Sequence, residues 1–300
     1  KTSRMSGVGV RVRTLGREEV GTVLAWAEAE GWDPGLADAA PFCAMDSGAF
    51  LGAFVGGEMV GCISIASYDE VFAFLGCFIV APEHRRRGYG AALWASAMAR
   101  AGTRVVGLDG VAEQVARYER AGFRATHRHV RMGGALPAAA HLVLLARWGA
   151  DVPVLPYESG HLHALHRYEQ AHRLFPAERL PFLRAWLANP GHAARVAFTC
   201  GTVSGYAVIR PTRSGAYKVA PLFAADLRTA SALLAALLAA VPQRSHVMID
   251  VPEPNADAML LARTLELRPA FACTRMFAHG TPPPVDDGAR VFGVTSLELG

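Results

Sequence analysis

Lysine is scarce in this sequence, although basic residues as a class are not. Only Lys1 and Lys218 are lysines, and arginine supplies the rest of the 30 basic residues. The 26 acidic residues leave a net charge of +4, which the two halves of the chain share equally. Residues 1–150 contain 16 basic and 14 acidic residues, and residues 151–300 contain 14 basic and 12 acidic residues. A nucleic-acid-binding chain concentrates basic residues on one face or in one segment. This balance therefore predicts no nucleic-acid partner.

Cysteine is also sparse, and long apolar runs are absent. The cysteines are odd in number and contain no C-x-x-C pair, which argues against a disulfide framework or a zinc knuckle and predicts no metal and a reducing, cytoplasmic location. The run Leu233–Val241 is less than half the length of a membrane span, and the N-terminal segment lacks the apolar stretch of a signal peptide. We therefore predict no membrane partner. The cysteines are Cys43, Cys62, Cys77, Cys200 and Cys273.

The chain has enough apolar material for a packed core and is long enough for two domains. It has 300 residues, of which 52% are hydrophobic and 19% charged. Three short segments recur in the same order with nearly constant spacing, which predicts two copies of one unit of about 140 residues. The paired segments are Gly57–Ser64 with Gly201–Val208, Val80–Pro82 with Val219–Pro221, and Arg131–Met132 with Arg275–Met276.

Hydrophobic periodicity gives a coarse order of elements for both copies. In the first copy we expect strands at 8–15, 49–55, 59–68, 71–80, 105–108, 123–132 and 141–145, and helices at 18–30, 88–101 and 112–121. In the second copy we expect helices at 162–175, 181–188 and 227–241, and strands at 194–199, 203–211 and 216–222. These expectations place the domains at 1–149 and 150–300, with a linker at 149–156 and a tail strand within 291–299.

The most informative segment is Phe78–Leu93, in which an apolar strand and Pro82 are followed by R-x-x-G-x-G and a helix. Glycines at 88 and 90 let the backbone N–H groups turn inward, and the N-terminus of a helix carries partial positive charge. The arginines at 85–87 add formal charge at the same place. This segment is suited to binding the pyrophosphate of a nucleotide.

This segment resembles the acetyl-CoA signature of the GCN5-related N-acetyltransferase (GNAT) superfamily, V-x-P-x-x-[QR]-x-x-G-x-[GA]. The residues that match it are Val80, Pro82, Arg85, Gly88 and Gly90. A second superfamily motif, Y-E-x-x-G-F, is matched by Tyr118–Phe123. The resemblance implies an α/β (α+β) fold with two tandem GNAT-like domains, each a mixed, mostly antiparallel central sheet flanked by helices.

The resemblance also implies that acetyl-CoA is the cosubstrate. The predicted cofactor-binding residues are Phe78, Ile79, Val80, Arg85, Arg86, Arg87, Gly88, Tyr89, Gly90 and Ala91. The sequence departs from the family at Val111, where many members have an asparagine, whereas the second copy has Asn255 at the matching position.

The second copy has lost the signature, so the sequence resembles the tandem subgroup whose C-terminal domain is degenerate. The positions that match Arg85, Gly88, Gly90 and Tyr118 hold Ala224, Leu227, Thr229 and Ala262. Leucine and threonine place Cβ atoms where a phosphate needs bare backbone. We therefore expect no CoA in the second copy.

For catalysis, the resemblance makes Tyr118 the proton donor to the thiolate. Several relatives carry a carboxylate base at a strand position that holds Phe74 here, so the base is sought elsewhere. Glu70 is the predicted base, acting through water, and Asp69, His127 and His129 remain alternatives. Cys77 reads as a core residue, which favours direct attack in a ternary complex over an acyl-enzyme.

The acceptor site is predicted at Trp32 and Asp33, because an aromatic ring beside a carboxylate suits a cationic amine. The second domain is expected to roof this site, with Glu298 of the tail as a further contributor. The predicted function is acetyl transfer to a small-molecule amine by a monomer or homodimer. The alternatives are a protein or peptide N-acetyltransferase and a non-catalytic acyl-CoA-sensing module.

Overall fold

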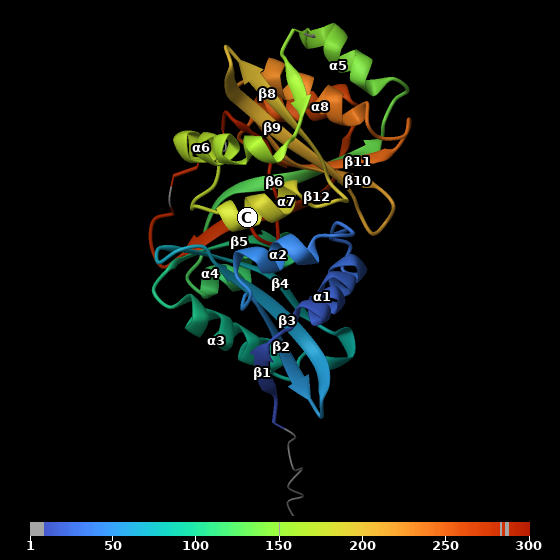
Figure 1. Cartoon of the computed structure of the whole chain (residues 1–300). Helices are drawn as coiled ribbons and strands as arrows, with labels where there is room; N and C mark the ends of the chain where they lie inside the picture. The colour runs from blue at the N-terminus through green and yellow to red at the C-terminus, as the bar shows by residue number, and fades with distance from the viewer. Residues whose placement is uncertain (1–8, 150, 283, 286–287) are drawn as a thin grey trace, which may run out of the picture.

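One continuous 13-stranded sheet runs through both halves of the chain (Figure 1). The computed structural model describes residues 9–149, 151–282, 284–285 and 288–300. The strands are β1 (Arg11–Thr14), β2 (Phe50–Val55), β3 (Glu58–Ser67), β4 (Phe72–Val80), β5 (Val105–Val111), β6 (Arg124–Ala135), β7 (Val154–Pro156), β8 (Ala193–Thr199), β9 (Thr202–Pro211), β10 (Tyr217–Ala224), β11 (His246–Pro252), β12 (Arg268–Ala278) and β13 (Val291–Gly293). Their order is β1-β2-β3-β4-β5-β12-β6-β11-β10-β9-β8-β7, and β13 pairs with β10.

Helices cover the faces of this sheet in each half (Figure 1). They are α1 (Arg17–Ala29), α2 (Ala39–Met45), α3 (Tyr89–Ala101), α4 (Val115–Arg120), α5 (Ala140–Trp148), α6 (Leu162–His172), α7 (Leu180–Leu187), α8 (Leu227–Leu238) and α9 (Ala256–Thr264), with single 3-10 turns at Pro82–His84, Ala112–Gln114 and Ser159–His161. Two strand pairs are parallel, β4 with β5 and β10 with β11, and the other paired strands run antiparallel. The predicted fold class, a mixed and mostly antiparallel sheet flanked by helices, is confirmed.

The last strands of the two repeats are exchanged between the halves. Strand β12 of the second repeat pairs with β5 of the first, and β6 of the first repeat pairs with β11 of the second. The two exchanged strands also pair with each other. The sequence leads us to expect two separate sheets, but this exchange makes them one.

The expected strand at 141–145 is wrong, because these residues lie in α5, which packs against α8 of the second half. Ala140 and Leu144, four residues apart, are both buried on one face of α5. A short apolar run does not distinguish a strand from a helix by periodicity alone. The expected linker at 149–156 also contains a short strand, β7, which pairs with β8, while residue 150 lies outside the described residues.

A buried charged cluster joins the halves beside the apolar core. The carboxylate of Asp38, from the segment before α2, accepts hydrogen bonds from Arg210 of β9 at 2.8 Å and 3.1 Å, and both side chains are 1% exposed. Burial alone raises the pKa of Asp38, but the Arg210 charge outweighs it and the pKa is lowered. His192 lies 3.8 Å from Asp38, and burial, together with the charge of Arg210, lowers its pKa to about 4.

This cluster predicts a loss of stability in mild acid. Because the pKa of His192 is lower in the folded chain than in the unfolded chain, its contribution is complete above about pH 6.5 and is lost as the pH falls toward 4. A shift of this size corresponds to about 3 kcal/mol. His192→Gln should flatten this part of the curve of unfolding free energy against pH, measured by urea denaturation. An unchanged slope between pH 6.5 and 4 would show that His192 titrates normally.

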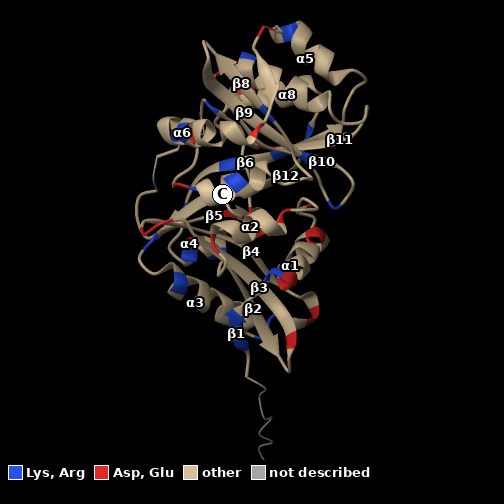
Figure 2. Ribbon diagram, viewed as in Figure 1, with Lys and Arg blue, Asp and Glu red and all other residues tan. Residues whose placement is uncertain are grey.

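Charged residues are spread over both halves of the surface rather than gathered in one region (Figure 2). Among the described residues, no helix is both long and apolar enough to cross a membrane. The same residues contain no group of three or more histidine, cysteine or acidic side chains placed to hold a metal ion.

Candidate active site

Strand β4 separates from β5 halfway along its length, and this opens the sheet. The two strands pair only over Phe72–Leu75, so the backbone of Gly76–Val80 has no partner on that side from β5. On its other side Gly76 pairs with Ser64 and Ile79 with Cys62, which leaves two residues opposite one and defines a β-bulge. Cys77 in this bulge has a φ of 45°, which a residue with a side chain rarely adopts. The bulge interrupts the regular ladder between β3 and β4 beside the opening.

A groove follows the open half of β4 to the start of α3. Gly88 caps α3 with a φ of 88° and without a side-chain hydrogen bond, so the N-terminus of the helix faces the groove with bare backbone. Arg85 beside it donates from Nε to the carbonyl oxygen of Val80 at 2.9 Å and pairs with Glu30. This geometry fits the pyrophosphate and pantetheine arm of a CoA molecule. The predicted residues that line the groove are Phe78, Ile79, Val80, Arg85, Arg86, Gly88, Tyr89, Gly90 and Ala91, whereas Arg87 does not line it.

In the second half, the opening beside β10 and the N-terminus of α8 correspond to the open half of β4 and the N-terminus of α3, and other parts of the chain occupy both. Strand β10 pairs with β11 only over Tyr217–Val219, and β13 then pairs with the open half of β10 at Leu222 and Phe223. The N-terminus of α8 is capped by the carboxylate of Asp226, which accepts from the N–H of Thr229 at 2.7 Å. The open strand edge and the bare helix N-terminus of the first groove are therefore both occupied in the second half.

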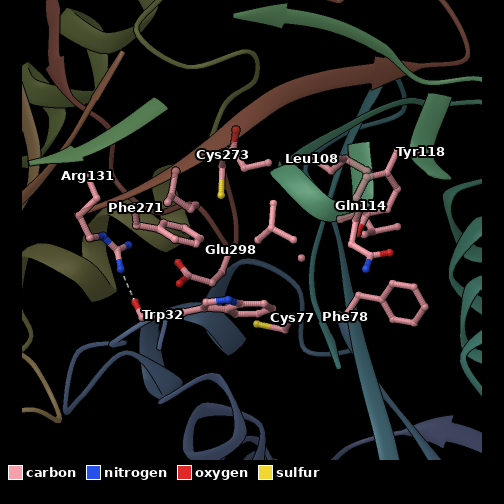
Figure 3. Close-up of a pocket in the computed structure, with 15 residues that line it drawn as sticks. Trp32, Cys77, Phe78, Leu108, Gln114, Tyr118, Arg131, Phe271, Cys273 and Glu298 are labelled. Carbon is pink, nitrogen blue, oxygen red and sulfur yellow. Dashed lines mark hydrogen bonds between the residues drawn. The ribbon is translucent and has the colours of Figure 1, made fainter. Parts of the chain in front are cut away.

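A second cavity continues from the groove toward the second half of the chain (Figure 3). Its solvent-sized cavity volume is about 80 Å³. Its lining residues are Trp32, Leu75, Gly76, Cys77, Phe78, Leu108, Asp109, Val111, Gln114, Tyr118, Arg131, Phe271, Cys273, Leu297 and Glu298. Five of these, Trp32, Phe78, Val111, Gln114 and Tyr118, also line the groove, so the two spaces meet there. We call this second cavity the inner pocket.

Tyr118 lies at the junction of the groove and the inner pocket. Its ring stacks on Trp94 at a centroid distance of 5.8 Å and packs against Phe123, which follows the left-handed turn at Gly122 that ends this helical segment. Burial raises the pKa of Tyr118 to about 12, so its hydroxyl keeps its proton at neutral pH. Val111 supplies an apolar wall at this junction.

Both halves of the chain build the polar end of the inner pocket. Arg131 of β6 donates both to the Asp250 carboxylate of β11 and to the backbone oxygen of Trp32, the latter at 2.6 Å. Lys218 of β10 donates to the same Trp32 oxygen at 3.3 Å. These contacts fix the Trp32 loop, and Figure 3 shows its ring across the pocket from Phe271, with the Glu298 carboxylate at one end between them.

Two of the predicted site residues lie away from the inner pocket. The Glu70 side chain is 96% exposed in the hairpin between β3 and β4 and pairs with Arg104. The carboxylate of Asp33 accepts hydrogen bonds from Thr212 and Ser214 at 2.7 to 2.8 Å, so it joins the halves instead of facing the pocket. Neither carboxylate lines either cavity, so the geometry does not support Glu70 as the base or Asp33 as a substrate contact.

The alternative bases are also engaged elsewhere. Asp69 closes a turn by accepting from the N–H groups of Val71 and Phe72. His129 is fully buried between His127 and Asp109, at 3.1 Å and 3.0 Å, and neither histidine lines the pocket. The sequence analysis missed Asp109, Arg131 and Phe271 as pocket residues, and the only signal for any of them was the repeated Arg-Met pair at 131 and 275.

Comparison with known proteins decides the family. The profile of the Acetyltransferase (GNAT) family matches residues 13–123, and that of an Acetyltransferase (GNAT) domain matches residues 168–293. The chain is a tandem GNAT protein. It is 29% identical over 285 residues to Holothin acyltransferase from Pseudoalteromonas sp. strain SANK 73390. The alignment covers 94% of this chain and 92% of that protein.

Solved structures agree with this tandem GNAT fold. A proposed acetyltransferase from Pyrococcus horikoshii superposes with a TM-score of 0.77 at 18% identity, over 100% of this chain and 99% of that one. A tandem GNAT protein from the clavulanic acid biosynthesis pathway superposes with a TM-score of 0.62 at 18% identity, over 91% and 99%. The two family matches and the acyltransferase relative show that the tandem GNAT chain is an acyltransferase, and the solved structures show its fold.

The groove predicts a strong effect of a side chain at Gly88. Gly88→Val places a β-branched residue at a φ of 88° and shifts the start of α3, so we expect acetyl-CoA to bind at least tenfold more weakly, which is about 1.4 kcal/mol. The matched control is Gly201→Val, at a φ of 77° in the turn between β8 and β9. Calorimetric titration with acetyl-CoA measures both. Equal affinities for the two variants would contradict the site assignment.

Proposed function

We propose that this chain transfers the acetyl group of acetyl-CoA to the amine of a small molecule by direct attack in a ternary complex. The observation that supports this most is the junction at Tyr118, where the cofactor groove and the inner pocket share their walls. A donor in the groove and an acceptor in the pocket would thus meet at one point without an intermediate carrier. Acetyl-CoA supplies the activated acetyl group.

Residues of the chain perform the remaining steps. The open edge of β4 and the N-terminus of α3 hold the donor, and backbone N–H groups of the segment that β5 leaves unpaired would stabilise the oxygen that becomes negative during transfer. Tyr118, protonated at neutral pH, gives its proton to the departing sulfur. Cys77 is buried, and burial raises the pKa of its thiol well above the usual range, which supports direct attack over an acyl-enzyme.

The walls of the inner pocket favour a small acceptor over a protein. They come from the loop after α1, from β12 of the second repeat and from the C-terminal tail, so the acceptor space is enclosed by both halves. The rings of Trp32 and Phe271 face each other across it (Figure 3), which suits an amine with a flat or apolar body. A cytoplasmic location and a monomer or homodimer remain our predictions.

A non-catalytic acyl-CoA-sensing module is the second candidate, because Val111 replaces the family asparagine. This module would need the groove but not the proton donor. Tyr118 therefore separates the two candidates.

Tyr118→Phe removes the hydroxyl and keeps the ring stacked on Trp94. We expect kcat to fall by about 10²–10⁴-fold with little change in acetyl-CoA affinity, because the proton donor acts only during transfer. A CoA-release assay with a panel of amines measures this, and Tyr157→Phe, at a residue that lines neither cavity, is the control. Turnover within threefold of the unsubstituted chain would make Tyr118 a structural residue.

Phe271 lines the inner pocket but not the groove, so a substitution there tests acceptor binding separately from acetyl-CoA binding. Phe271→Ala should raise KM for the acceptor by about tenfold or more, because a lost aromatic contact is worth roughly 0.5–1.5 kcal/mol beyond its buried area. KM for acetyl-CoA should stay the same. Steady-state kinetics with each substrate varied in turn gives both values. A rise in KM for acetyl-CoA instead would place Phe271 in the donor site.

A further inference from the structure

The C-terminal tail enters the active site of the first half from an anchor in the second half. Strand β13 lies in the opening between β10 and β11, and the N–H of Val294 donates to the backbone oxygen of Asp250 at 2.9 Å. Buried Arg179 then donates to the hydroxyl of Thr295 at 3.0 Å. The tail thus occupies the place in the second repeat that corresponds to the cofactor slot of the first.

Beyond this anchor the tail crosses directly over β4. A Cβ atom at Gly76 would lie 2.1 Å from the backbone oxygen of Glu298, so only glycine permits this crossing. The hydroxyl of Tyr68 donates to the backbone oxygen of Leu299 at 2.6 Å. These contacts hold the backbone on both sides of Glu298 and leave its side chain in the inner pocket.

Two carboxylates line the inner pocket, and they differ in their partners. Asp109 accepts from Arg275 at 2.9 Å and 2.8 Å and from His129 at 3.0 Å, and although burial opposes it, the Arg275 charge lowers the pKa of Asp109. Glu298 is 6% exposed and accepts from the hydroxyl of Ser296 at 2.6 Å. The described residues contain no arginine, lysine or histidine in an ion pair with Glu298, although the buried charges of Arg131 on β6 and Lys218 on β10 act on its carboxylate.

We infer that Glu298 is the general base of this acyltransferase, and the inference rests on the proposed function. The nitrogen–carbon bond forms as the carbon–sulfur bond breaks, the proton lost by the amine passes to the Glu298 carboxylate, and the thiolate takes a proton from Tyr118. The Ser296 hydroxyl accepts from the N–H groups of Glu298 and Leu299 at 3.0 Å and 3.2 Å while donating to the carboxylate, and so it orients the base. The second repeat thereby contributes the anchor for a catalytic residue of the first.

The test compares Glu298→Gln with Glu298→Asp in the full-length chain. Glu298→Gln should lower kcat by about 10²–10⁴-fold and leave the Kd of acetyl-CoA within twofold. Glu298→Asp keeps a carboxylate and should recover part of the loss. The control is Glu58→Gln, an exposed residue at the start of β3, which should behave like the unsubstituted chain.

The pH profile distinguishes a base from a merely structural residue. The experiment measures kcat/KM against pH with two acceptor amines of different pKa. A fall in kcat/KM on the acid side that is the same for both amines comes from the enzyme rather than from the amine. This fall should be present in the unsubstituted chain and in Glu298→Asp, and absent in Glu298→Gln. Persistence of that fall in Glu298→Gln, a kcat within threefold, or a parallel loss of acetyl-CoA binding would overturn the inference. Failure of the unsubstituted chain to release CoA with any amine would instead refute the proposed function.

Discussion

Two reciprocal ion pairs between the repeats hold the structure together. Arg131 of the first repeat pairs with Asp250 of the second, and Arg275 of the second repeat pairs with Asp109 of the first. Each arginine lies directly opposite its aspartate in the register of neighbouring strands, β6 with β11 and β12 with β5. All four side chains are at most 5% exposed. Removing one partner of such a buried pair typically costs about 3–5 kcal/mol, because it leaves an uncompensated charge.

These pairs specify the strand exchange as well as stabilising it. A slip of one residue would turn every side chain of the exchanged strands to the opposite face and bury the arginines without partners. The correct register places Arg131 and Cys273 on the face that lines the inner pocket, together with Asp109. The interactions that join the repeats therefore also position the walls of the acceptor site.

The second repeat has kept the fold of its partner while its cofactor slot serves another purpose. In the first repeat the opening beside β4 is available to a ligand, and in the second the opening beside β10 holds β13. An unpartnered strand edge inside a domain leaves backbone polar groups without hydrogen bonds. In the second repeat the chain fills this edge with β13, and the same segment continues to the inner pocket.

Local pattern was sufficient for much of this description. The order of strands and helices from 49 to 121, the phosphate-binding turn at Gly88 and Gly90, and the position of Tyr118 follow from periodicity and from two short motifs, because each depends on neighbouring residues. The repeat was also visible in the sequence, but α2, β11, α9 and β12 were not expected, and a strand was expected where α5 forms. Short amphipathic segments carry too few periods to separate a helix from a strand.

Most of the groove comes from one contiguous segment, β4, the turn after it and the start of α3, which is why a short motif could indicate it. The inner pocket instead depends on contacts between distant segments. Trp32, Arg131, Phe271 and Glu298 are up to 266 positions apart and meet because the last strands exchange and the tail returns across Gly76. Contacts with Thr212 and Ser214 of the second half hold Asp33 away from the pocket, whereas Glu70 lies in the exposed hairpin between β3 and β4. Contacts between distant segments depend on strand order, which local spacing does not encode.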